Sequence, residues 1–202
     1  MTIDVTRSAS ITVVCGGSGS GKSAWVKQQV RDARRLVVWD VDDEYATEGC
    51  RRITTAGELV QALKQSGRGP ARIAFCPPVM SQAAFSIWAR AAFAWGECVA
   101  VAEELAGVTT PAKAPPGWHE LVSRGRKRGV VLFAVTQRPS ESDKTVMGNA
   151  TRLHVGRLQR AQDRAYMARE LDVEQVRIDR LKKLEWIERD NGELKEGRVT
   201  FT

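Results

Sequence analysis

A run of eight residues, Gly16-Gly-Ser-Gly-Ser-Gly-Lys-Ser23, constrains the fold more than any other part of this 202-residue chain. It follows the β-rich segment Ile11–Cys15 and leads into residues 23–30, whose apolar side chains have helical spacing. Glycine at four of its first six positions permits a tight loop that side chains would strain. A strand, a loop and a helix are therefore predicted in direct succession.

The rest of the chain alternates between strand-like and helix-like segments. The predicted strands cover residues 36–39, 72–76, 98–102, 130–135 and 152–155, and the predicted helices cover residues 55–64, 81–95, 118–128, 161–171 and 173–184. Thr55 is expected to cap the first of these helices, and Gly129 to end the basic one. Asn191-Gly192 is typical of the turn in a small C-terminal hairpin. This alternation predicts an α/β sandwich with a largely parallel sheet.

The glycine-rich run fits the pattern G-x-x-x-x-G-K-[ST] in the strand-to-helix context that the pattern requires. Backbone N–H groups of such a loop converge on phosphate oxygens, and the helix N-terminus adds partial positive charge. Lys22 is expected to reach the β- and γ-phosphates of ATP, and the Ser23 hydroxyl to ligate Mg²⁺. A purely structural turn would not need both residues at these positions. The candidate nucleotide-binding residues are Gly16, Gly17, Ser18, Gly19, Ser20, Gly21, Lys22, Ser23 and Ala24.

Two carboxylates, Glu103 and Glu104, directly follow the apolar run 98–102. This arrangement resembles a Walker B strand, in which Glu103 takes the Mg²⁺ position and Glu104 polarises the attacking water. The first position is most often Asp in such strands, and Glu103 is longer by one methylene, so it could reach the metal through a water or with a shifted backbone. The alternative is two solvated acids at a helix N-terminus, where the helix dipole favours negative charge.

The strand at residues 130–135 ends in Thr136-Gln137-Arg138-Pro139-Ser140, and a basic segment ending Arg126-Lys127-Arg128-Gly129 precedes it. This combination resembles the HerA/FtsK superfamily of DNA-pumping ATPases, as do Asp40 and Glu44-Tyr45 after the second strand. The resemblance implies a RecA-like P-loop NTPase fold, a three-layer sandwich, and a role for Gln137 in reading the γ-phosphate from the strand end. A polar strand terminus without that role is the alternative for Gln137.

The resemblance also implies that an arginine from one subunit completes the site of its neighbour in a ring. Arg126 best matches the family position for this arginine finger, and Arg124, Arg128 and Arg138 are rivals. For each of them, a solvated basic helix face is the alternative.

Basic residues outnumber acidic ones by 31 to 24, which gives a net charge of +7 and favours polyanionic partners. A motor that moves a duplex needs non-specific phosphate contacts. Lys113 and Trp118, in the loop 108–119 that is the candidate for lining the channel, and Lys127 are the candidates for contacting DNA. An ordinary surface loop is the alternative.

With little sequence outside the motifs, the chain most resembles the genome-packaging ATPases of tailless, internal-membrane bacteriophages of the tectivirus and corticovirus type. That resemblance implies ATP hydrolysis that drives double-stranded DNA into a preformed procapsid. It further implies a hexameric homo-oligomeric ring, capsid vertex or portal proteins as partners, and action in the host cytoplasm and at the packaging vertex of the virion. A single RecA-like domain over residues 1–202 is expected, with a core at about 8–158 and C-terminal helices and a hairpin at 159–202.

Two other activities remain open. A Zot-like assembly ATPase of filamentous phage would share the motor motifs, but the sequence predicts no membrane segment. A P-loop small-molecule kinase would share the length and the loop, but it would not require a water-polarising acid such as Glu104. A scaffold that retains nucleotide without turnover is suggested only by Glu103 in place of Asp.

Neither histidine nor cysteine indicates a metal site. Cys15, Cys50, Cys76 and Cys98 form no C-x-x-C pair and are expected to be buried free thiols. His119 and His154 are far apart in sequence.

Overall fold

The computed structural model describes residues 10–201, and within them nine strands form one sheet in the order β3-β4-β2-β5-β6-β1-β7-β8-β9. The strands from β3 to β7 in this order pair in parallel, and β8 and β9 pair antiparallel. Their bounds are β1 Ile11–Cys15, β2 Arg35–Trp39, β3 Arg51–Ile53, β4 Ala71–Phe75, β5 Val99–Ala102, β6 Val131–Thr136, β7 Arg152–Gly156, β8 Glu185–Asp190 and β9 Glu193–Arg198. The fold is the predicted α/β sandwich with a largely parallel sheet.

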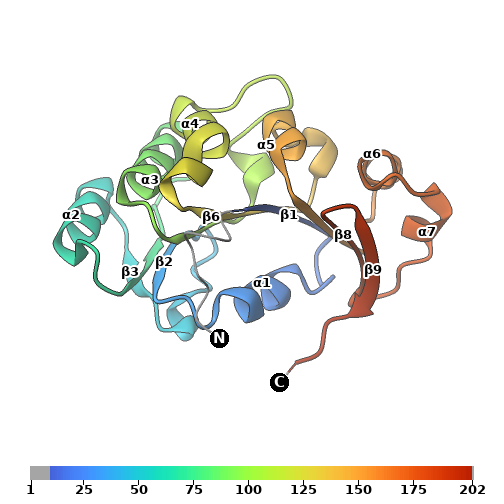
Figure 1. The fold of residues 1–202 in the computed structure, drawn as a ribbon, viewed down its shortest axis with the longest axis horizontal. Helices are drawn as coiled ribbons and strands as arrows, with labels where there is room; N and C mark the ends of the chain where they lie inside the picture. The colour runs from blue at the N-terminus through green and yellow to red at the C-terminus, as the bar shows by residue number, and fades with distance from the viewer. Residues whose placement is uncertain (1–9, 202) are drawn as a thin grey trace.

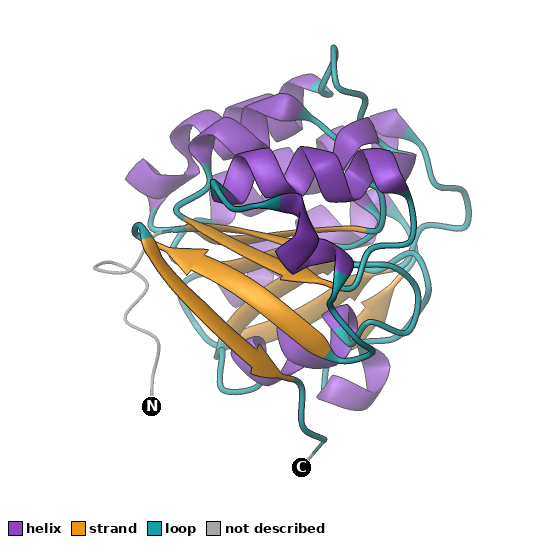
Figure 2. Ribbon diagram, turned by 90° about the vertical axis from the view of Figure 1, so that its right-hand side faces the viewer, coloured by secondary structure: helices purple, strands orange, loops and turns teal. Residues whose placement is uncertain are grey.

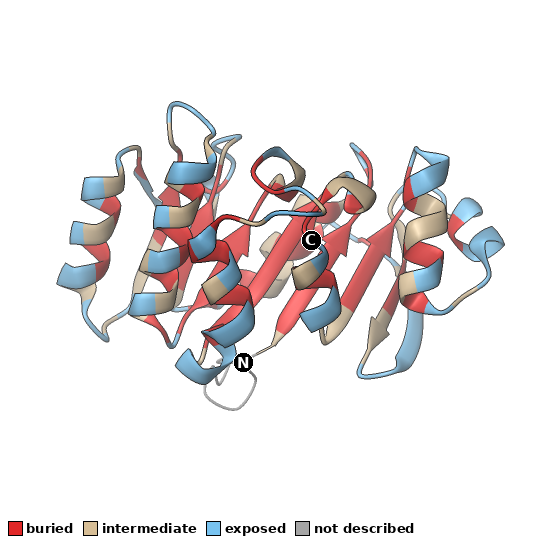
Figure 3. Ribbon diagram, turned by 90° about the horizontal axis from the view of Figure 1, so that it is seen from above, coloured by how far each residue is buried: buried red, intermediate tan, exposed pale blue. Residues whose placement is uncertain are grey.

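Helices cover both faces of the sheet and make three layers (Figure 1). One face packs against α2 to α6, and the opposite face packs against α1, so that the central strands are buried on both sides (Figure 3). This double burial explains why the central strands read as continuous apolar runs. The helix bounds are α1 Lys22–Val30, α2 Ala56–Ser66, α3 Gln82–Trp95, α4 Pro116–Arg124, α5 Lys144–Asn149, α6 Ala161–Leu171 and α7 Gln175–Asp179.

Local signals place several element ends where the sequence predicts them. Thr55 caps α2 in a reciprocal pair of hydrogen bonds with Glu58, and Ser81 caps α3. Gly129 takes a left-handed conformation with φ 69° and ends the basic segment before β6. These elements need only nearby residues to define them.

The structure differs from the sequence prediction at four elements. The basic helix predicted at 118–128 begins earlier, at Pro116, and gives way after Arg124 to the 3₁₀ turn Gly125–Arg128. The helix predicted at 173–184 is reduced to α7. Strand β3 and helix α5 have no predicted counterpart, because both are short and their sequences carry little periodicity.

The C-terminal hairpin is formed as predicted, and it extends the main sheet through pairing of β8 with β7 (Figure 2). Asn191 and Gly192 both have positive φ, 48° and 89°, as a two-residue turn between twisted strands requires. His154 of β7 stacks on Trp25 of α1 with ring centroids 3.9 Å apart and shares a hydrogen bond with Glu188 of β8. The hairpin is thereby joined to the helix that follows the glycine-rich loop.

Among residues 10–201, no helix combines the length and the apolar character needed to cross a membrane. All four cysteines are free and buried, as predicted.

Candidate nucleotide-binding site

The glycine-rich loop leaves the carboxyl end of β1, between β6 and β7. Neighbouring strands hold its first residues, because the Gly16 N–H donates to the carbonyl of Thr136 and the Gly17 N–H to that of Arg157, at 3.3 and 2.8 Å. Gly21 has φ 94° and immediately precedes α1. A Cβ there would also lie 3.1 Å from side-chain atoms of the C-terminal segment. The backbone conformation therefore favours glycine at position 21, and a Cβ there would be in tight contact with these side chains.

A cavity of about 250 Å³ opens beside this loop at the carboxyl edge of the sheet. One wall is the loop and the start of α1, and the other carries side chains that follow β2, β5 and β6. Parallel pairing of these strands brings their carboxyl ends to one edge, which is where α/β sheets bind ligands. The lining residues are Ser18, Gly19, Lys22, Ser23, Asp40, Asp42, Glu44, Glu103, Glu104 and Gln137.

Glu103 is buried at the end of β5 and accepts a hydrogen bond from the Tyr45 hydroxyl at 2.7 Å. Burial raises the pKa of Glu103 to about 7, although the Tyr45 hydrogen bond and the charge of Lys22 lower it. A carboxyl group in this environment gains from a cation placed beside it.

Glu104 and Gln137 form a hydrogen-bonded pair, with Nε2 of Gln137 donating to Oε1 of Glu104 at 2.6 Å. Glu104 has φ 49° and ψ 48°, a left-handed conformation that is uncommon for residues with a side chain. The two predicted residues therefore lie together, although 33 positions separate them in the sequence.

Five carboxylates and a single lysine line the cavity among the described residues. Burial and the negative charges of Glu104 and Asp40 raise the pKa of Asp42. Mg²⁺ prefers oxygen ligands, and the Ser23 hydroxyl and the Glu103 carboxylate would supply them here. The donor set and the excess of negative charge both fit a magnesium ion.

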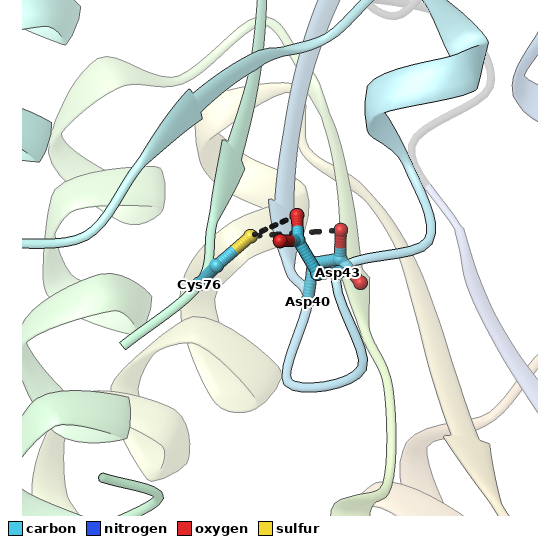
Figure 4. Close-up of side chains that lie close together, drawn as sticks. All are labelled: Asp40, Asp43 and Cys76. Atoms are coloured by element: carbon cyan, nitrogen blue, oxygen red, sulfur yellow. Dashed lines mark hydrogen bonds between the residues drawn. The ribbon is translucent and has the colours of Figure 1, made fainter. Parts of the chain in front are cut away.

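Asp40, Asp43 and Cys76 lie close together beside this cavity (Figure 4). These side chains already have partners within the protein. The carboxylate of Asp40 accepts hydrogen bonds from the backbone N–H groups of Glu44 and Tyr45 at 3.0 and 2.9 Å. Asp43 pairs with an arginine, Arg52, at 2.6 Å, and burial raises the pKa of the Cys76 thiol to about 12. A neutral thiol and satisfied carboxylates form a cluster that fixes the loop after β2.

Three of the four arginine-finger candidates are engaged within the chain. Arg124 pairs with Glu120 and Arg138 with Glu141, both at 3.3 Å. Arg128 donates to the carbonyls of Phe93 and Ala94 at the end of α3. Arg126 is exposed, and its guanidinium forms no hydrogen bond or ion pair with residues 10–201. All four lie outside the set of residues that line the cavity.

The prediction that Trp118 contacts DNA is wrong. Trp118 lies in the first turn of α4, it is fully buried, and its indole N–H donates to Asp143 at 3.0 Å. Its ring packs against Phe85 of α3 at a centroid distance of 5.1 Å. The helix begins at Pro116, which turns this side chain into the core. Lys113 and Lys127 are both exposed.

No sequence pattern predicts a role for Asp42 or for the Tyr45 hydroxyl. The acidic run 40–44 after the second strand is the signal that could have placed Asp42 in the cavity. The Tyr45–Glu103 contact depends on the pairing of β2 with β5, which no local pattern reveals.

Solved structures share this fold. The genome packaging NTPase B204 from Sulfolobus turreted icosahedral virus 2, in complex with ATP-gammaS, superposes with a TM-score of 0.79 at 16% identity, over 95% of this chain and 98% of that chain. VirB4 of Thermoanaerobacter pseudethanolicus superposes with a TM-score of 0.71 at 11% identity, over 99% of this chain and 93% of that chain. With its glycine-rich loop and its strand-end acids, the chain has the P-loop NTPase fold of these proteins.

Similarity in sequence to a phage protein identifies the family of the chain. The chain is 35% identical over 177 residues to protein P9 of Pseudoalteromonas phage PM2, a match that covers 85% of this chain and 79% of P9. The chain belongs to the family of protein P9. No family model matches the chain.

Proposed function

We propose that this chain is a viral genome-packaging ATPase that couples hydrolysis of Mg-ATP to translocation of double-stranded DNA into a preformed procapsid. The observation that carries the proposal is the cavity in which the glycine-rich loop faces Glu103, Glu104 and Gln137. Membership of the P9 family supports a phage protein, and the fold shared with a genome packaging NTPase supports the packaging role.

The residues on the two walls of the cavity have different roles in hydrolysis. Backbone N–H groups of the loop and Lys22 bind the phosphates, while Ser23 and Glu103 would hold the metal. Bound Mg²⁺ would neutralise charge on the β- and γ-phosphate oxygens. Glu104 orients and polarises the attacking water, and Gln137 couples that carboxylate to the γ-phosphate position through their hydrogen bond.

The proposed working unit is a hexameric homo-oligomeric ring. Arg126 has no partner among residues 10–201 and does not line the cavity of its own chain, so it suits a contact with the nucleotide of a neighbour. Exposed Lys113 and Lys127 would contact DNA phosphates without reading sequence. The sheet extends from Ile11 to Arg198, which supports one RecA-like unit over residues 1–202.

Within this proposal, the ring acts in the host cytoplasm and at the packaging vertex of the virion, where capsid or portal proteins are its partners. Steady-state ATP hydrolysis, measured with and without double-stranded DNA at low and moderate salt, tests the activity. Size-exclusion light scattering on the same sample tests the ring. We expect stimulation by DNA of any sequence, weakened by salt, in a ring-sized assembly. Phosphate transfer to a small acceptor, with no response to DNA, would instead identify a kinase.

A further inference from the structure

Tyr45 lies in the loop after β2, and its side chain is fully buried in the layer that contains α1. Its hydroxyl donates to Oε1 of Glu103 at 2.7 Å. The two residues follow adjacent strands, since Trp39 pairs with Ala102 and the Glu103 N–H donates to the Trp39 carbonyl at 3.2 Å. Sheet pairing therefore brings the loop that carries the phenol next to the carboxylate.

The loop that carries Tyr45 is held by contacts on both sides. The carboxylate of Asp40 accepts the backbone N–H groups of both Glu44 and Tyr45. Nζ of Lys27, on α1, lies 5.3 Å from the centre of the Tyr45 ring. The phenol is thus anchored to both β2 and the helix that follows the glycine-rich loop.

Glu103 has one more rotatable bond than the aspartate that is usual at this position, so it needs a restraint to present an oxygen in a fixed place. A buried carboxylate also requires hydrogen-bond donors. The Tyr45 hydroxyl meets both needs at Oε1. Oε2 accepts no hydrogen bond from residues 10–201, and Glu103 lines the nucleotide cavity.

We propose that Tyr45 is a positioning residue for the metal site: its hydroxyl fixes Oε1 of Glu103 and leaves Oε2 as the oxygen that serves the Mg²⁺ bound with nucleotide. The proposal rests on the proposed function, because it assumes that Glu103 serves the metal of Mg-ATP. In this arrangement, the longer side chain of Glu103 extends far enough to accept the hydrogen bond from the Tyr45 hydroxyl. An aspartate at 103 would be one methylene too short to keep this contact without a shift of the backbone.

The test compares Tyr45→Phe with Tyr166→Phe. The chain has two tyrosines, and Tyr166 is a matched control because its hydroxyl is also close to a glutamate, Glu170, but lies outside the cavity. The affinity for a fluorescent, non-hydrolysable ATP analogue is measured by titration, once with Mg²⁺ and once with EDTA. The ratio of the two affinities reports the contribution of the metal.

We expect Tyr45→Phe to reduce the enhancement by Mg²⁺ about tenfold and to leave the affinity in EDTA unchanged, because residues that orient a ligand typically change metal affinity by that much. Tyr166→Phe should match the wild type in both conditions. In the Glu103→Asp background, Tyr45→Phe should have almost no further effect on the ratio, since the contact it removes is already lost.

A wild-type ratio in Tyr45→Phe would overturn the positioning role, as would an equal loss of affinity in Mg²⁺ and in EDTA, which would indicate a purely structural side chain. Absence of any enhancement by Mg²⁺ in the wild type would instead overturn the Mg-ATP assignment, and this proposal with it.

A spectroscopic measurement on the wild type avoids any effect of mutation on folding. Tyrosine labelled with ¹³C at the ζ position gives one resonance for each of the two tyrosines. Addition of Mg²⁺ to the nucleotide complex should shift the Tyr45 resonance and leave that of Tyr166 in place. A Tyr45 resonance that does not respond to the metal would contradict the proposal.

Discussion

The cavity at the carboxyl edge of the sheet and the basic segment Gly125–Arg128 differ in how their side chains are held. In the cavity, Glu103 is bonded to Tyr45 and Glu104 to Gln137, and the backbone of each follows a buried strand. In the basic segment, Arg126 and Lys127 are exposed and make no ion pair with residues 10–201. One region is organised by the chain itself, whereas the other has side chains that remain available for a partner.

This difference separates two kinds of functional residue. Residues that act within one subunit can be positioned in advance by the sheet, which reduces the reorganisation needed at the moment of reaction. Residues that act on a neighbour or on DNA gain their geometry only in the assembly. Substitutions in the two regions should therefore differ in whether they affect the isolated chain or only the assembled motor.

Lys22→Ala should have the largest effect, because it removes the charge that the loop directs at the phosphates. We expect turnover to fall by more than about 10³-fold, with nucleotide affinity greatly reduced in the isolated chain as well. Arg31→Ala, at the exposed C-terminal end of α1, is the control and should retain binding. Isothermal titration measures the nucleotide affinity, and phosphate release measures the turnover. Normal activity of Lys22→Ala would contradict the role of the loop in binding the phosphates.

Arg126→Ala should spare nucleotide binding and reduce turnover of the assembled ring by about 10³-fold. Because a finger serves a neighbouring site, mixtures of mutant and wild-type chains should lose activity more steeply than the mutant fraction. Arg124→Ala, tested in parallel, removes a side chain that is already paired with Glu120. A linear loss in the Arg126→Ala mixtures would place Arg126 outside the trans site.

Glu104→Gln should lower turnover by about 10²-fold while ATP still binds, since an amide cannot take up a proton from the attacking water. Glu174→Gln, at the exposed start of α7, serves as a control. Single-turnover hydrolysis with pre-bound ATP measures the chemical step directly. Rapid hydrolysis by Glu104→Gln would show that another carboxylate of the cavity positions the water.

Local sequence signals predicted most of the fold and the centre of the site. Thr55, Gly129 and Asn191-Gly192 act through neighbouring residues, and the loop from Gly16 to Ser23 is defined by its own spacing. Contacts between distant segments were not predictable in this way. The Tyr45–Glu103 hydrogen bond needs the β2–β5 pairing, and the burial of Trp118 depends on how α4 packs on α3.

Trp118→Ala tests whether α4, which leads into the basic segment, is packed on the core through this residue. The sequence predicts that Trp118 faces DNA, but the side chain lies in the core. Loss of a fully buried indole and its hydrogen bond to Asp143 should reduce the free energy of unfolding by about 3 kcal/mol. His119→Ala, at the next and exposed position of α4, should change it little. Denaturant unfolding measures both, and equal stabilities would contradict the packing described for α4.

Lys113→Ala and Lys127→Ala should have the smallest effects, confined to the response to DNA. Each exposed lysine that contacts a phosphate contributes about one unit to the slope of log affinity against log salt, so each substitution should reduce that slope by about one. Stability and DNA-independent hydrolysis should remain those of the wild type, because neither side chain lines the cavity. Binding of a fluorescent duplex over a range of salt concentrations measures the slope. If both variants keep the wild-type slope, the DNA-contacting surface must lie elsewhere, and the exposed basic residues near Arg126 would then serve contacts between subunits.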